Sequence, residues 1–298
     1  MKKTSYFTHI SALTSLFVLG NAVIILPMGK VNEFTFLSFL ISAVFGIILY
    51  FPASLCAKKL FGEKNHKNQI LKTIRIITLS ALSVFAIFCG ADAFSAFLNF
   101  VKTVILPNTA TFFIALIFAV CVLYFALKKA ENILKFFLIF AVLSGAIVLF
   151  FFFATSFDFN LRNIFIFRLP DLKTFLNQAT EYVKNPVLPT LILPFYNMSV
   201  FENTKKGASL IGLLCGYILL GLCVIGSVLL FGANFAGDLE FPYFSASSTV
   251  SFGRLFTRLD GFCYFLFFIA VLARITVCLH VTFYSLKKIN SVLNTKTE

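Results

Sequence analysis

Two charged side chains lie inside stretches of sequence that are otherwise apolar enough to sit in lipid. Asp92 lies in A-I-F-C-G-A-D-A-F-S-A-F, and Arg274 lies in F-F-I-A-V-L-A-R-I-T-V-C-L-H. A charge at the centre of a bilayer costs roughly 3 kcal/mol on insertion scales, so such residues usually face the protein interior and pair there or form a polar site. We therefore expect both side chains to face the interior.

The chemistry of this pair leaves two interpretations open. A buried ion pair would lock two helices together and have no other role. Alternatively, Arg274 offers its planar fork of N–H groups to a substrate carboxylate, while Asp92 holds the arginine or an ammonium group. The small residues beside Asp92, Gly90 and Ala91, suit either close packing or a ligand.

A third feature is the proline-rich stretch Lys184 to Asn197, K-N-P-V-L-P-T-L-I-L-P-F-Y-N. Each proline removes a backbone donor and clashes with the preceding turn, so this span is not expected to form a continuous helix. At membrane depth the freed carbonyls need protein partners or a wet cavity, and transporters place substrates at such broken helices. We expect regular helical bonding to be lost near Pro186 to Thr190. A kinked span without a ligand is the alternative.

The first apolar stretch has a weak point of its own, in L-G-N-A-V-I-I-L-P. Gly20 permits unwinding or close approach, and the side-chain amide of Asn21 needs a partner in lipid. Inverted-repeat transporters place paired broken helices at corresponding positions of their two halves, which here are the first and sixth spans. We therefore expect a second interruption, from Gly20 to Ala22, close to the first one and at mid-depth.

Composition indicates what kind of protein must hold these residues. Hydrophobic residues make up 59% and charged residues 12% of the 298 residues. Soluble domains carry about twice that share of charge. The pattern predicts an all-α, polytopic transmembrane domain over residues 1–298. Its eight spans are expected at about 7–28, 34–55, 74–99, 109–127, 133–154, 180–200, 207–232 and 258–285.

Lysine and arginine are distributed unevenly among the predicted loops. One set of loops holds about twice as many as the other, and the short loops alternate. By the positive-inside rule, both termini are cytoplasmic, as an even number of spans requires. Two outer segments are longer than turns. We expect an amphipathic surface helix or a loop within 155–179, and a short helix capping an outer vestibule or a loop within 233–257.

Several function classes have no support in the sequence. There is no P-loop, G-x-S-x-G, H-E-x-x-H or nucleotide fingerprint, so neither an enzyme nor a cofactor is expected. The seven cysteines are scattered without metal-ligand spacing. The formal net charge of +13 is spread over short loops rather than gathered in one patch, so we expect no nucleic-acid partner.

The last third of the chain resembles a known family. F-G-A-N-F-A-G-D-L-E-F-P-Y-F, then V-S-F-G-R-L-F-T-R-L-D-G-F-C-Y-F-L-F-F-I-A-V-L-A-R, is similar to the spore germination permease family. Shared features are the F-G…P loop, the R-L-D sequence from Arg258 to Asp260 and a later basic residue, here Arg274. The opening G-N-A-V-I-I-L-P resembles the first helix of the wider amino acid–polyamine–organocation superfamily.

The resemblance implies a LeuT-like fold and the role of the B subunit of a nutrient germinant receptor in the spore inner membrane. It also implies A and C partner subunits and an amino-acid-sized nutrient ligand. By position, the resemblance assigns the ligand site to seven residues: Gly20, Asn21, Ala22, Asp92, Pro189, Thr190 and Arg274.

Members of this family are expected to have ten helices, whereas eight spans are predicted here. The missing pair would lie outside the central bundle, so stability or partner docking would change rather than the site, unless the chain is a degenerate homologue. Three functions remain open: a germinant-sensing subunit, an amino-acid transporter, or a scaffold subunit without a ligand.

Overall fold

A computed structural model of the chain describes residues 3–22, 35–61, 69–163, 172–200, 207–250 and 259–294. These residues form helices and short connections, and no strand occurs among them. The longer helices, in chain order, are α1 (Lys3–Leu19), α3 (Thr35–Phe61), α4 (Gln69–Phe100), α5 (Thr111–Ala126), α6 (Ala130–Thr155), α7 (Leu172–Tyr182), α9 (Leu193–Val200), α10 (Gly207–Phe231) and α13 (Gly261–Asn294). Shorter elements are the π-helices η1 (Val101–Ile105) and η4 (Val183–Val187), the 3₁₀ turns η2 (Ser156–Asp158) and η3 (Leu161–Asn163), and α8 (Leu188–Thr190), α11 (Ala233–Asp238) and α12 (Pro242–Ser248).

Five helices in the described parts of the chain are long and apolar enough to cross a membrane. They are Thr35–Phe61, Lys72–Ile105, Ala130–Asp158, Gly207–Phe231 and Gly261–Val292. They coincide with the predicted spans 34–55, 74–99, 133–154, 207–232 and 258–285. A chain with several such helices is a multi-pass membrane protein.

The other three predicted spans have a different form. The apolar helices Phe7–Leu19 and Thr111–Ala126 are shorter, and α5, with 16 residues, rises only about 24 Å. The predicted span 180–200 is divided between η4, α8 and α9. The predicted end of the first span, residues 23–28, lies outside the described residues. The count of eight spans therefore stays a prediction, and so does the LeuT-like fold.

Helix α13 forms the centre of the bundle. From Leu266 to Cys278 nearly every side chain is buried, because α4, α1, α5, α6 and α9 all pack around this helix. By contrast, α3, α4 and α6 leave one face open, with Val44, Ile77 and Val142 more than half exposed. Such apolar faces are suited to lipid, and they explain why an apolar composition does not require complete burial within the chain.

Glycines on α10 allow α1 to approach very closely. A Cβ atom at Gly212 would lie 2.7 Å from Cβ of Thr14, and one at Gly216 would lie 2.6 Å from Cβ of Val18. These distances are too short for any side chain. The four-residue spacing places both glycines on one helix face, the small-xxx-small pattern by which membrane helices bring their backbones together.

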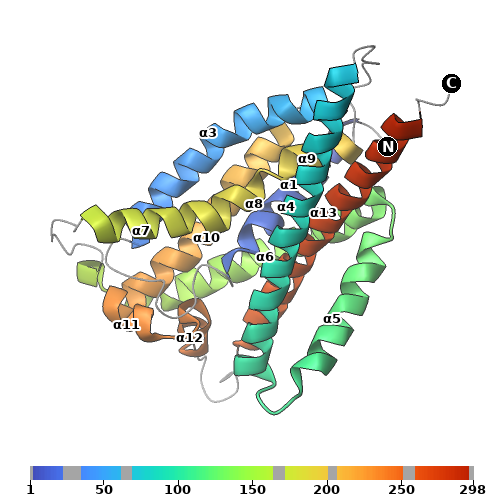
Figure 1. Cartoon of the computed structure of the whole chain (residues 1–298). Coiled ribbons are helices and arrows are strands. Elements are labelled where there is room, and N and C mark those ends of the chain that lie inside the picture. Colours follow the sequence, from blue (N-terminus) through green and yellow to red (C-terminus); the bar gives the residue numbers. More distant parts are fainter. Residues whose placement is uncertain are drawn as a thin grey trace.

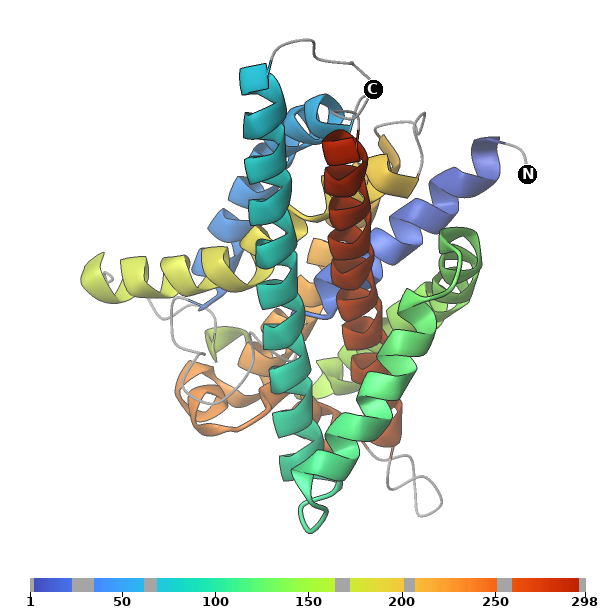
Figure 2. The same ribbon diagram turned by 45° about the vertical axis from the view of Figure 1, so that its right-hand side comes forward.

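The two ends of the described chain lie at the same end of the bundle. Figures 1 and 2 show the start of α1 and the end of α13 near the top, with the connection between α4 and α5 at the opposite end. Helices α11 and α12 also lie toward that opposite end. This arrangement agrees with the predicted placement of both termini on one side, while the side that faces the cytoplasm stays a prediction.

The two long outer segments both contain helices. Helix α7 has apolar residues at helical spacing, Leu172, Phe175, Leu176 and Ala179, as expected for an amphipathic helix. It lies across the direction of α4 and α13 in Figure 2. Helices α11 and α12 fall in the segment 233–257, and α12 packs against α10 and α6. Gly232, with φ of 76°, starts α11 in a backbone conformation that favours glycine.

Candidate functional site

The first interruption lies where the sequence predicts it. Helix α1 ends at Leu19, and Gly20 and Asn21 form a turn in which the Asn21 N–H donates to the Val18 carbonyl oxygen at 3.0 Å. A Cβ atom at Gly20 would lie 2.8 Å from the carbonyl oxygen of Ala270 on α13. Glycine is therefore required here because the backbones of α1 and α13 meet.

Asn21 connects this turn to the centre of α13. Its Nδ2 group donates to the Val18 carbonyl oxygen at 2.8 Å, and its Oδ1 atom accepts a hydrogen bond from Nη1 of Arg274. The expectation that the Asn21 amide needs a partner is therefore confirmed, and the partner is the charged residue that the sequence singles out on the last span.

Arg274 is the largest fully buried side chain among the described residues. Only Nη1 donates a hydrogen bond there; Nε and Nη2 have no hydrogen-bond partner in the described part of the chain. The guanidinium carbon lies 6.0 Å from the ring centre of Phe17, within range of a cation–π contact. This guanidinium therefore has two N–H groups available for a further hydrogen-bond acceptor. A buried N–H without a partner destabilises a protein by about 1–3 kcal/mol, and by more in a charged group.

Asp92 lies beside Arg274 but is not enclosed. Its Oδ2 atom is 3.9 Å from Nη2 of Arg274, which is an ion pair too long for a hydrogen bond. The Asp92 side chain is 57% exposed, whereas that of Arg274 is fully buried. The prediction that both charges face the interior is therefore wrong for Asp92. One turn of α4 presents Gly90 and Ala93 to the bundle, which turns the neighbouring Asp92 toward its edge.

Residues that the sequence reasoning did not single out complete the surroundings of Arg274. Cys89 of α4 and Cys278 of α13 lie next to the guanidinium. A Cβ atom at Gly90 would be 3.4 Å from Cβ of Cys278, which is ordinary van der Waals contact, so α4 and α13 pack closely beside the ion pair without requiring glycine there. A cysteine in an apolar span has the character of a small core residue, so nothing in the sequence distinguishes these two from other buried positions.

The second interruption is longer than predicted. Residues Val183–Val187 form a π-helix around Pro186, Leu188–Thr190 form a single α-turn, and Leu191 and Ile192 form a turn before α9 begins. The expected loss of regular helical bonding near Pro186 is confirmed. Proline removes one donor, and the wider π-turns accommodate its ring. The extension to Ile192 was not predicted.

Two predicted site residues lie in this second interruption, and their contacts run toward α3 and α10. The Thr190 hydroxyl donates to the Val187 carbonyl oxygen at 2.6 Å, and Tyr217 of α10 lies near Thr190, although its buried hydroxyl makes no hydrogen bond among the described residues. Pro189 is buried beside it, on α8, which contacts α3. The structure thus brings Gly20, Asn21, Asp92 and Arg274 together, with Ala22 buried next to them, and these contacts do not join Pro189 or Thr190 to Arg274. Assignment of all seven to one ligand site stays a prediction.

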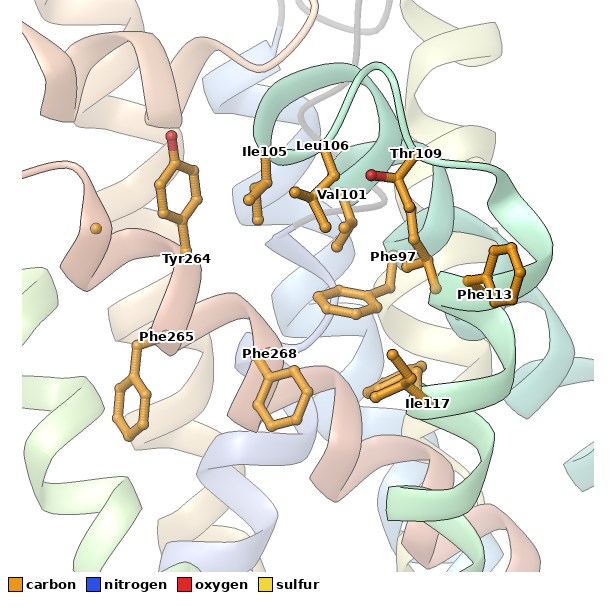
Figure 3. Close-up of a pocket in the computed structure, with 13 residues that line it drawn as sticks. Phe97, Val101, Ile105, Leu106, Thr109, Phe113, Ile117, Tyr264, Phe265 and Phe268 are labelled. Carbon is orange, nitrogen blue, oxygen red and sulfur yellow. The ribbon is translucent and has the colours of Figure 1, made fainter.

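A large apolar pocket lies elsewhere, between α4, α5 and α13, and it has a volume of about 480 Å³. Figure 3 shows Phe97, Ile117 and Phe268 around it. The hydroxyl-bearing residues in its lining are Thr109 and Tyr264. Its lining includes none of the seven predicted site residues, so it lacks the charged groups that would recognise an amino acid.

The comparison with protein families decides which group of membrane proteins this is. A profile of the spore germination protein family matches residues 6–297, which is nearly the whole chain. The chain belongs to the spore germination protein family. This confirms the resemblance seen in the sequence. One residue that carries the resemblance, Arg258 of the R-L-D sequence, lies outside the described residues. Neither the curated proteins nor the solved structures that were searched gave a significant match.

Proposed function

We propose that this germination-family membrane protein is the B subunit of a nutrient germinant receptor, and that it binds a small carboxylate-bearing nutrient at Arg274. The observation that carries the proposal is the fully buried guanidinium with two N–H groups, Nε and Nη2, that lack hydrogen-bond partners among the described residues. A planar fork of donors fits a carboxylate in two parallel hydrogen bonds.

The groups around Arg274 could also recognise the ammonium group of an amino acid. Asp92, 3.9 Å from Nη2, is close enough to hold an ammonium group next to a carboxylate on Arg274. The Asn21 amide fixes one edge of the guanidinium, which leaves the other edge for a ligand. Because Asn21 follows the end of α1, a ligand on Arg274 would act on the interruption itself, which is a means to couple binding to a movement of α1.

The proposal is tested by binding of neutral amino acids, each compared with its amide, which lacks the carboxylate. The purified chain, alone and in complex with A and C subunits, is titrated by calorimetry. We expect an amino acid to bind and its amide to bind at least tenfold more weakly. Arg274→Lys should weaken binding of the amino acid and reduce that preference while the protein stays folded, because lysine keeps the charge and loses the fork.

Thr249→Val provides a control, since that hydroxyl donates to the Ala246 carbonyl at the end of α12 and is not one of the predicted site residues. It should bind as the wild type does. Equal binding of acid and amide to the wild type would overturn the assignment of Arg274 to a carboxylate.

The transporter is the second candidate, because the interrupted segments around Gly20 and Pro186 are features that transporters share. Uptake of the bound amino acid by proteoliposomes containing the chain alone would favour it. Binding without uptake, together with co-purification of A and C subunits, would favour the receptor subunit. No binding of any amino acid, with retained co-purification, would leave a scaffold subunit.

A further inference from the structure

A second pocket, with a volume of about 420 Å³, lies between α3, α9 and α10. It is separate from Arg274 and from the apolar pocket of Figure 3, and its lining combines three kinds of surface. These are a buried polar floor, an apolar wall that is open at the side, and one lysine, Lys58 of α3.

The floor of this pocket is a hydrogen-bonded polar cluster. Nδ2 of Asn197 donates to Oγ of Ser209, and the hydroxyl of Tyr50 lies within hydrogen-bonding reach of both residues. Asn197, Ser209 and Tyr50 are 6%, 5% and 6% exposed. Three polar side chains from three different helices therefore converge at the bottom of a cavity, where an apolar ligand alone would gain nothing from them.

The wall of the pocket is apolar and exposed at its side. Phe51, Leu55 and Ile211 line it and are 54%, 57% and 44% exposed. Phe51 and Leu55 are four residues apart and so lie on one face of α3, where they form an apolar strip that leads along the helix toward Lys58. Such a strip has the shape and polarity for an acyl chain.

Lys58 lies in the last turn of α3 and is exposed. A cation is favoured at this end of a helix, because the unpaired carbonyls there carry partial negative charge. The lysine stem extends along apolar surface and carries its ammonium to the membrane interface. The loop that follows α3 is predicted to be cytoplasmic. Basic pockets between transmembrane helices on the cytoplasmic side of membrane proteins bind the head groups of anionic lipids.

We propose that this pocket binds one anionic phospholipid, with its phosphate on Lys58, its glycerol-ester region on Asn197 and Ser209, and an acyl chain along Phe51, Leu55 and Ile211. The proposal is independent of the nutrient site. A lipid in this pocket would nevertheless affect the second interruption, because α9 carries Asn197 and begins directly after Leu191 and Ile192. A bound lipid therefore connects α9 to α3 and α10.

The experiment is native mass spectrometry of the full chain from micelles doped with phosphatidylglycerol or with phosphatidylcholine. We expect the wild type to retain one phosphatidylglycerol in preference to phosphatidylcholine. Lys58→Gln should weaken that retention about fivefold, the effect of one lysine at an anionic membrane surface. Lys59→Gln is the matched control, because Lys59 is the next residue of the same helix turn and does not line the pocket.

A second variant tests the cavity rather than the charge. Ser54→Phe fills the pocket from the α3 side; Ser54 is only half-buried, and its hydroxyl bonds back to the Phe51 carbonyl, so no buried polar partner is stranded. We expect it to lose the lipid while it elutes as a monodisperse species in size exclusion.

Three results would overturn the proposal. Equal losses of bound phosphatidylglycerol in Lys58→Gln and Lys59→Gln would show that the lipid is held by general surface charge rather than by this pocket. Equal retention of both lipids by the wild type would show non-specific acyl binding. Retention of phosphatidylglycerol by Ser54→Phe at the wild-type level, together with displacement of the lipid from the wild type by millimolar glycerol 3-phosphate, would show a surface site for a soluble anion.

Discussion

The Nη1 group of Arg274 donates a hydrogen bond to the side chain of Asn21, a residue 253 positions earlier in the chain. This bond joins the middle of the central helix α13 to the turn that ends α1. The fully buried charge of Arg274 is therefore hydrogen-bonded by a residue that lies beyond the end of α1. A change of backbone at Asn21 must change the environment of Arg274, and the reverse holds as well.

The first prediction concerns this bond. Asn21→Ala should lower the free energy of unfolding by about 1–3 kcal/mol, because it leaves a buried, charged donor without an acceptor. Asn99→Ala, at an exposed asparagine on α4, is the control and should have little effect. Thermal unfolding can be followed with a thiol-reactive dye, because Cys89, Cys223, Cys263 and Cys278 are buried. The exposed Cys56 and Cys215 and the half-buried Cys121 are first replaced by serine. Equal melting temperatures of the two variants would contradict the prediction.

The second prediction concerns the ion pair. Arg274→Gln should destabilise the protein more than Asp92→Asn, because Arg274 is fully buried and Asp92 is more than half exposed. The coupling energy in a double-mutant cycle should stay below about 1 kcal/mol, as for long, partly exposed ion pairs. Both single variants should weaken amino-acid binding. Strong coupling in stability, without an effect on the ligand, would assign the pair a purely structural role.

The third prediction concerns the contact of α1 with α10. Gly216→Val should destabilise the protein strongly or prevent folding, because a Cβ atom there would lie 2.6 Å from Cβ of Val18 and the two helices would be forced apart. Gly261→Ala is the matched control, since no heavy atom lies within 4 Å of a Cβ built there. Expression level and size-exclusion profile report the outcome. A monodisperse Gly216→Val protein would show that α1 does not need this close approach.

The fourth prediction concerns topology. Reporter fusions at Lys129 and Lys205 should report a cytoplasmic location, and fusions at Lys173 and Gly237 an external one. The reason is the excess of lysine and arginine in alternate loops, together with the common end of α1 and α13. An external location of the C-terminal end would contradict both the span count and the predicted orientation.

Much of the fold could be predicted because membrane-spanning helices are recognisable in a sequence by their length and hydropathy. Five predicted spans correspond to long helices, and both interruptions occur where glycine, asparagine or proline weakens the helix. The sequence also predicted that Asp92 and Arg274 either pair or form one polar site, since a charge in lipid needs a partner, and the two side chains do lie 3.9 Å apart.

The remaining details depend on helix rotation, which a uniformly apolar sequence does not encode. The strong apolar character of α4 gives no sign of which face turns inward, so the exposure of Asp92 was missed. The role of Gly212 and Gly216 was missed for a related reason: small residues reveal a close approach only when the opposite helix is known. The same holds for Asn197 and Ser209, because their hydrogen bond depends on how α9 and α10 face each other.

The π-helix from Val183 to Val187 has a consequence for how α7 can move. A π segment contains one residue more than the α-helical stretch it replaces, so its conversion to regular α-helix would slip the register of everything on one side by one position. One position of an α-helix is a rotation of about 100°, with an advance of about 1.5 Å. For α7, whose polar and apolar faces differ, that rotation would present a different face to α3. Conversion of this segment to regular α-helix would therefore rotate α7 by one residue position, and Pro186 opposes that conversion because its ring clashes with the preceding turn of an α-helix.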